Sequence, residues 1–173
     1  CDSLESKKRK DCVVVLNIIL ESLLKWFAPI LVFTTEEIYS LIKNEKESIH
    51  ENLFVKIPDG WKNNDLNDKW MKLFKIKQEA NIAIEEKRSN KEIGSSLEAE
   101  IKITTDVNNF NLLADLDLAE YFITSKAEKH KSVKKDEIKI EVKKTKGIKC
   151  PRCWKILEKK CTRCEKIVSS KFK

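Results

Sequence analysis

The chain has 173 residues, six cysteines and a formal net charge of +7 at pH 7. That length suffices for one domain or two small ones with a hydrophobic core, which excludes a short disulfide-stapled peptide. No charged and then apolar signal peptide opens the sequence, and Cys1 and Cys12 provide no disulfide framework, so a reducing cytoplasm is expected. Because the first residue is Cys1 and not Met, we expect a carboxyl-terminal piece of a longer protein.

The positive charge is concentrated at the end of the chain. Residues 1–125 contain 17 Lys and Arg against 22 Asp and Glu, whereas residues 126–173 contain 18 against 6. A basic tail attracts polyanions such as nucleic acid. Lysines can equally do no more than solvate a small lobe, so composition alone leaves both interpretations open.

The first predicted helix covers residues 11–27, within an apolar run that continues to Phe33. The run has the length of a membrane span, but Asn17, Glu21 and Lys25 recur every four residues as one polar stripe. Charges inside a span are costly, and Pro29 should end the helix after Phe27. We therefore expect a helix buried on most of its circumference in a helical bundle, not in a membrane.

A short second helix is expected after Pro29. Thr34 and Glu37 have the spacing of a capping box, and Ile38, Leu41 and Ile42 would supply the buried face. Residues 44–64 are interpreted as a surface connection that Phe54 and Trp61 pin to the bundle.

A long helix is predicted for residues 66–88, opened by Asn67 or Asp68. Its apolar positions at helical spacing are Leu66, Trp70, Leu73, Phe74, Ile76, Ala80, Ala83 and Ile84. Arg88 and Lys91 at its end are candidate phosphate contacts, although cations also suit the negative end of a helix dipole for structural reasons alone. Glu85 and Glu86 are interpreted as solvated, and no catalytic residue is assigned.

After Gly94 the hydrophobic period changes to two. Ala99, Ile101 and Ile103 alternate with polar residues, which predicts a half-buried strand. A short helix over it is expected at residues 110–118, further strands at 121–123 and 138–142, and a solvated loop at 126–135. His50 and His130 have no partner in the sequence and are given no role. The fold class is therefore mainly α with a small α+β part.

Four cysteines end the predicted fold, in the motifs Cys150-Pro151-Arg152-Cys153-Trp154 and Cys161-Thr162-Arg163-Cys164. Two Cys-X-X-Cys pairs this close predict a tetrahedral zinc site with Cys150, Cys153, Cys161 and Cys164 as ligands. Two disulfides or unrelated buried thiols are the alternatives. A thioredoxin-like redox pair is disfavoured because neither pair is expected to open a helix within a strand-helix-strand pattern.

Metal should supply most of the folding free energy of this segment, because its few apolar side chains cannot offset the ordering of the backbone. Four thiolates leave no open coordination position, so the zinc would be structural. Arg152, Trp154 and Arg163 would lie on the outer surface of the knuckle beside several lysines. Aromatic and guanidinium planes between cations are typical of a nucleic-acid surface.

Several motifs together resemble bacterial isoleucyl-tRNA synthetase. They are, in order, Ala28-Pro29 with Phe33-Thr34-Thr35-Glu36-Glu37, Ile93-Gly94-Ser95-Ser96-Leu97-Glu98-Ala99, Phe122-Ile123-Thr124-Ser125, and Lys149-Cys150-Pro151-Arg152-Cys153-Trp154 with its second cysteine pair. The resemblance implies an anticodon-binding helical bundle at residues 1–92, an α+β junction domain at 93–145 and a zinc-binding tail at 146–173.

The resemblance also implies a function. The whole enzyme would use ATP and Mg²⁺ to attach isoleucine to its tRNA, as a cytoplasmic monomer, through catalytic and editing domains that these residues do not contain. This part would bind the anticodon stem-loop of isoleucine tRNA, and neither DNA nor a membrane, through Arg88, Lys91, Arg152, Trp154 and Arg163. Trp154 either stacks on an RNA base or covers the zinc thiolates. The alternative is a free-standing zinc-ribbon accessory protein that binds nucleic acid.

Overall fold

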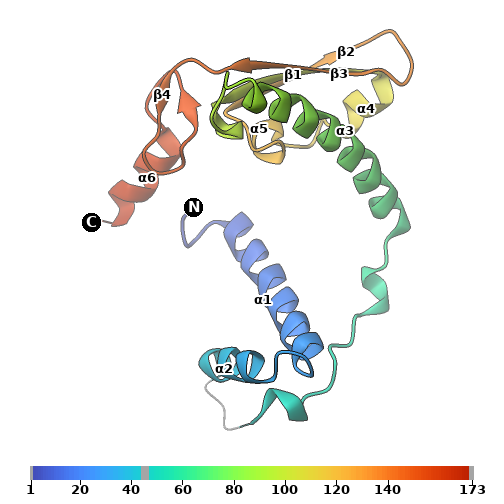
Figure 1. Cartoon of the computed structure of the whole chain (residues 1–173), viewed down its shortest axis with the longest axis vertical. Helices are drawn as coiled ribbons and strands as arrows, with labels where there is room; N and C mark the ends of the chain where they lie inside the picture. Colours follow the sequence, from blue (N-terminus) through green and yellow to red (C-terminus); the bar gives the residue numbers. More distant parts are fainter. Residues whose placement is uncertain (1, 44–46, 172–173) are drawn as a thin grey trace. The chain divides into compact units, whose positions relative to one another are not determined.

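The computed structural model describes residues 2–43 and 47–171. Cys1, the first three residues of the predicted connection (44–46) and the last two of the predicted tail (172–173) lie outside the described residues. The chain forms two compact units, Cys1–Lys62 and Asn63–Lys173 (Figure 1). About half of it is helical, with a small sheet in the second unit. Among the described residues, no helix combines the length and the hydropathy that a membrane crossing requires.

The first unit contains helices α1 (Lys7–Phe27) and α2 (Val32–Lys43) and two 3-10 turns, η1 (Ile49–Glu51) and η2 (Asp59–Trp61). Helix α1 ends at Phe27, which confirms the predicted effect of Pro29, but it begins four residues earlier than predicted. Its Glu21 carboxylate accepts a hydrogen bond from Lys25 Nζ at 2.7 Å, and this bond lowers the pKa of Glu21. The buried core of the unit is Leu24, Ala28, Tyr39 and Ile49.

The apolar faces of α1 are mostly exposed in this chain. Leu24 is its one buried residue among those described, and Val14, Leu16 and Trp26 are all more than half exposed. The expectation of a helix buried on most of its circumference is therefore wrong for the described residues. The reason is geometric, because α2 and η1 cover only one stripe of the helix.

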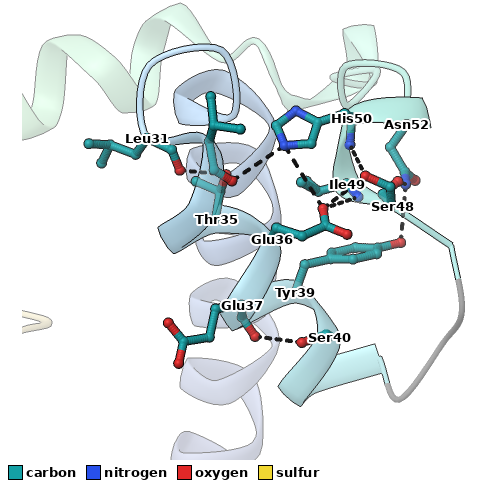
Figure 2. Close-up of polar contacts among 11 residues, drawn as sticks. Leu31, Thr35, Glu36, Glu37, Tyr39, Ser40, Ser48, Ile49, His50 and Asn52 are labelled. Carbon is teal, nitrogen blue, oxygen red and sulfur yellow. Dashed lines mark hydrogen bonds and ion pairs between the residues drawn. The ribbon is translucent and has the colours of Figure 1, made fainter.

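Glu36 anchors η1 to α2 (Figure 2). Its Oε2 atom accepts hydrogen bonds from the Ser48 hydroxyl and from the Ile49 backbone N–H, each at 2.9 Å. Asn52 Nδ2 donates to the Tyr39 hydroxyl at 3.2 Å on the same side of α2. Ile49, which is 1% exposed, is thereby held in the core.

The predicted capping box is wrong. Helix α2 starts at Val32, so Thr34 and Glu37 lie inside its first turns. The hydroxyl of Thr35 donates back to the Leu31 carbonyl at 2.9 Å instead of capping a helix. The buried face contains Thr35 and Tyr39, with Ile38 half-buried, whereas the other predicted contacts are exposed. Those exposed residues are Leu41, Ile42, Phe54 and Trp61.

The second unit begins with the long helix α3 (Asn64–Ser89), whose N-cap is Asn63 and not the predicted Asn67 or Asp68. The Asn63 side chain accepts a hydrogen bond from the Leu66 N–H at 2.9 Å. The buried stripe is Leu73, Ile76, Ala80 and Ile84, as predicted, whereas Leu66, Trp70 and Phe74 are about half exposed. This stripe packs on the sheet, so α3 belongs with the sheet in the second unit. The predicted domain boundaries, at residues 92 and 145, stay predictions.

The sheet has the order β2-β1-β3. Strand β1 (Ala99–Thr105) pairs in parallel with β2 (Lys126–Lys131) and antiparallel with β3 (Ile138–Lys144). Helices α3, α4 (Val107–Leu112) and α5 (Leu118–Tyr121) contribute to the core on one face of the sheet (Figure 1). Strands β1 and β3 confirm the period-two prediction.

Two predictions between those strands are wrong. Residues 126–131 were expected in a loop but form the edge strand β2, and residues 121–123 were expected in a strand but end the short helix α5. An edge strand needs few apolar residues, and in β2 only Ala127 and Lys129 are partly buried. The apparent strand 121–123 is instead a helix end, closed by Ile123 with a φ of 57°.

Replacing Glu36 with Ala should lower the free energy of unfolding of the first unit by about 1 kcal/mol, because a backbone N–H and a hydroxyl lose their acceptor at a partly exposed site. Glu37→Ala is the matched control, since the Glu37 carboxylate points away from η1 (Figure 2). Amide hydrogen exchange at Ile49 measures the effect. Equal exchange rates in the two variants would refute the anchoring role.

Candidate functional site

The first cysteine pair lies at the end of a small hairpin formed by β4 (Ile148–Lys149) and β5 (Ile156–Leu157). The Cys150 N–H donates to the Lys155 carbonyl, and the Trp154 N–H donates to the Cys150 carbonyl, both at 2.9 Å. These two bonds close the chain from Cys150 to Lys155 into a tight turn. Cys150 is buried beneath it and Cys153 is half-buried.

The second pair lies at the start of helix α6 (Thr162–Lys171). Cys161 directly precedes the helix, and its carbonyl accepts a hydrogen bond from the Glu165 N–H at 3.0 Å. Cys164 is in the first turn and is buried. The second pair therefore opens a helix, but no strand follows α6 within the described residues, so this helix does not lie in the strand-helix-strand pattern of a thioredoxin-like redox site.

The four sulfur atoms gather at one point. The Sγ atoms of Cys150, Cys153, Cys161 and Cys164 all lie within 4.8 Å of one another. The Cys153 and Cys161 sulfurs are 3.8 Å apart, far longer than a disulfide bond of about 2.05 Å. Tetrahedral coordination with metal–sulfur bonds of about 2.3 Å requires sulfurs about 3.8 Å apart. The arrangement could therefore hold a metal ion, and a soft four-sulfur donor set suits Zn²⁺.

Two of the thiols have displaced pKa values. Backbone N–H groups of Cys153 and Arg152 lower the pKa of Cys150 to about 6, so that thiol readily forms a thiolate. Burial, followed by hydrogen bonding to Cys161, raises the pKa of Cys164 to about 12. A metal that takes all four sulfurs must therefore displace a proton from Cys164 at any ordinary pH.

Trp154 is held in a conformation that L residues rarely adopt. Its φ is +64°, in the left-handed region, because the turn from Cys150 to Lys155 must reverse at this residue. The side chain is 61% exposed. Arg152 and Arg163 are also exposed, one within each cysteine motif. The structure thus brings three of the predicted RNA contacts to the same small lobe as the four cysteines.

Arg88 and Lys91, the other two predicted contacts, line a separate hollow of about 350 Å³ at the end of α3. Arg88 Nη1 forms an ion pair with Glu85 Oε2 at 2.8 Å, and Lys91 has a φ of 60°. For Arg88, a role in stabilising the end of the helix is therefore enough to explain its position, without a phosphate contact.

Two residues that fix the lobe were missed in the sequence. The Ser125 hydroxyl accepts a hydrogen bond from the Ile156 N–H at 2.6 Å and donates to the Leu97 carbonyl, which joins β5 to the start of β1. Gly147 has a φ of +142°, and a Cβ there would lie 2.4 Å from the Leu157 carbonyl oxygen. The only signal for Ser125 in the sequence is its place in the motif that ends Thr124-Ser125.

The open face of the sheet is electrically compensated. Cations and anions alternate along and across its strands, in the rows Lys143–Glu100–Lys126 and Glu141–Lys102–Glu128. Lys126 Nζ lies 3.1 Å from Glu128 and 3.2 Å from Glu100, and hydrogen bonds to both carboxylates raise the pKa of Lys126. This face therefore offers a polyanion little net attraction.

Comparison with known proteins identifies the family. Residues 2–103 match the family described as the anticodon-binding domain of tRNA ligases. The chain belongs to this family. The chain is also similar to proteins named isoleucine–tRNA ligase, among them one from Pelagibacter ubique, 53% identical over 90% of the chain, and one from Agrobacterium fabrum, 35% identical over 90%. A third, from Buchnera aphidicola, is 36% identical over 89%.

The match to these tRNA ligases covers only part of each relative. The chain spans 17% of the length of the Pelagibacter and Agrobacterium proteins and 18% of the Buchnera protein. The resemblance to isoleucyl-tRNA synthetase seen in the sequence motifs is confirmed.

The left-handed turn at Trp154 makes a prediction about stability. Because a Cβ at positive φ costs about 1 kcal/mol, the free energy of unfolding of the Trp154→Gly variant should be about 1 kcal/mol higher than that of Trp154→Ala. Lys155 has a negative φ and provides the control, since there Gly should be less stable than Ala. Urea unfolding of the four variants measures both differences. The same order at both positions would refute the strained turn.

Proposed function

We propose that this chain is the tRNA-recognition part of an isoleucyl-tRNA synthetase, whose whole protein uses ATP and Mg²⁺ to attach isoleucine to its tRNA. The observation that carries this proposal is the lobe in which four cysteines, two arginines and an exposed tryptophan come together, in a chain 53% identical to an isoleucine–tRNA ligase. Catalysis and editing are assigned to the remainder of the whole protein. This part binds RNA and does no chemistry.

Zn²⁺ is the metal we assign to Cys150, Cys153, Cys161 and Cys164. A separation of 3.8 Å between two of the sulfurs matches a tetrahedral site, and two of the four side chains are buried. Bound zinc would supply folding free energy and no catalysis, because all four positions are filled by protein. The lobe then presents its arginines and tryptophan in fixed positions.

Trp154 is assigned as a stacking platform for an unpaired base of the anticodon loop. Its 61% exposure favours this role over covering the thiolates, which was the other interpretation of the sequence. Arg152 and Arg163 provide planar hydrogen-bond donors beside it, and the lysines of residues 146–173 attract the phosphates. Arg88 and Lys91 form a second, weaker contact with the stem.

The rival function is a free-standing zinc-ribbon protein that binds nucleic acid. It would account for the knuckle and the basic tail. It would leave unexplained the family match over residues 2–103, all of which lie outside the tail. We therefore favour the synthetase.

Zinc removal should unfold the lobe and spare the sheet. One zinc per chain is expected, and a strong chelator should speed amide exchange at Trp154 and Glu165, whose N–H groups bond within the lobe, but not at Ile101 in β1. Lowering the pH should weaken zinc binding, because the raised pKa of Cys164 means that protons compete for this ligand. A chain that lacks zinc and keeps slow exchange in the chelator would overturn the metal site.

Trp154→Ala should weaken binding of an isoleucine anticodon hairpin tenfold or more, since stacking on one base is worth about 1–3 kcal/mol. In the intact synthetase the same change should raise the KM for tRNA and leave isoleucine-dependent pyrophosphate exchange unchanged. Trp61→Ala is the control, because Trp61 is 57% exposed and lies in the first unit. If the two variants bind the hairpin equally well, Trp154 does not stack on RNA.

A further inference from the structure

A hollow of about 750 Å³ lies where the metal-binding lobe meets the sheet. One wall comes from the strand ends of the sheet and the connection that follows β3, and the other comes from β5 and the segment between the two cysteine pairs. Ser125 also lines it, beside Ile156 and Leu157 of β5. Its volume lies within the range of ligand-binding clefts, about 300–1,000 Å³.

The charge of this hollow is strongly positive. Among the described residues that line it, eight are Lys or Arg and four are Asp or Glu. Glu100 is neutralised by Lys126 at 3.2 Å. By contrast, Lys146, Lys155 and Lys159 have no carboxylate within ion-pair distance among the residues that the structure describes. Their ammonium groups are therefore available to an anionic ligand, unlike those on the compensated open face of the sheet.

The hollow is preformed by the contacts that join its walls. The hydrogen bonds of Ser125 to Ile156 and Leu97 tie β5 to the sheet, and the Thr145 N–H donates to the Glu98 carbonyl at 2.8 Å. Gly147 allows the chain to pass close to Leu157. A cationic cleft with fixed walls binds an anion without first ordering its own backbone.

We propose that this hollow binds the sugar–phosphate backbone of the RNA strand next to the base that stacks on Trp154, through Lys146, Lys155 and Lys159. This inference rests on the proposed function. Lys155 directly follows Trp154, and Arg163 also lines the hollow, so a strand that stacks on the tryptophan runs beside these cations. Three ammonium groups on both walls suit successive phosphates better than a single small anion.

The test compares two triple variants of equal charge in the zinc-loaded chain. The first replaces Lys146, Lys155 and Lys159 with Gln. The control replaces Lys72, Lys134 and Lys135, which are exposed and lie outside the hollow, with Gln. Affinity for the isoleucine anticodon hairpin is measured at several salt concentrations. Zinc content and far-UV circular dichroism should match those of the unmodified chain.

The hollow variant should bind the hairpin at least tenfold more weakly, and the slope of log affinity against log salt should fall by about 2, because each lost phosphate contact contributes about 0.7 for a single strand. The control should keep the slope. Equal slopes in the two variants, with binding that still depends on Trp154, would overturn this inference and leave the proposed function standing.

Two other outcomes would also overturn the inference that the hollow binds the RNA backbone. If the unmodified chain does not bind the hairpin, the inference and the proposed function fail together. If a nucleoside triphosphate binds the unmodified chain but not the hollow variant, and both bind RNA alike, the hollow takes a small phosphorylated ligand and not the RNA backbone.

Discussion

The geometry of four sulfur atoms is the constraint on which the carboxyl-terminal lobe depends. Among its described side chains, residues 146–169, the only buried ones are Cys150 and Cys164, so the lobe has no hydrophobic core apart from its thiols. Two backbone hydrogen bonds shape the hairpin turn and one opens α6, but such bonds contribute only about 1 kcal/mol each to stability. A metal ion held by these four sulfurs, which lie within 4.8 Å of one another, would add the stability that packing does not provide here.

The second unit has two surfaces rich in lysine, the open face of the sheet and the hollow beside the lobe, and they differ in how far the lysines are paired with acids. On the open face of the sheet Lys102, Lys126 and Lys143 each have an anionic neighbour in register, so their charges are largely compensated. In the hollow beside the lobe, Lys146, Lys155 and Lys159 have no ion-pair partner among the described residues, because the connection after β3 and the segment between the cysteine pairs are rich in lysine and poor in acids. Net charge alone, +7 for the chain, could not distinguish these two surfaces.

The sequence predicted features that depend on local pattern and missed those that depend on distant partners. Strands β1 and β3, the end of α1 at Phe27, the buried stripe of α3 and the four-cysteine cluster follow from spacing or from proline. Strand β2 has little hydrophobic pattern, because β1 provides its hydrogen bonds at the edge of the sheet. Glu37, and not Glu36, was the predicted capping residue, whereas the donors that bind Glu36 come from the distant turn at Ile49. The Ser125 hydroxyl accepts its hydrogen bond from Ile156, 31 residues further along the chain, and no local sequence pattern predicts such a distant partner.

Trp154 combines a strained backbone conformation with an exposed side chain. A turn that reverses after Cys153 requires a left-handed residue, and glycine would occupy that position without strain. The chain places its bulkiest side chain there and leaves it 61% exposed, so neither local propensity nor burial explains the choice. Strain of this kind persists where the surroundings enforce it, and here the enforcing contacts are the hairpin bonds of Cys150 and the clustered sulfurs. In the proposed function, a backbone held in this way is ordered before the RNA binds, so a metal ion at the four cysteines would both stabilise the lobe and prepare it for the RNA.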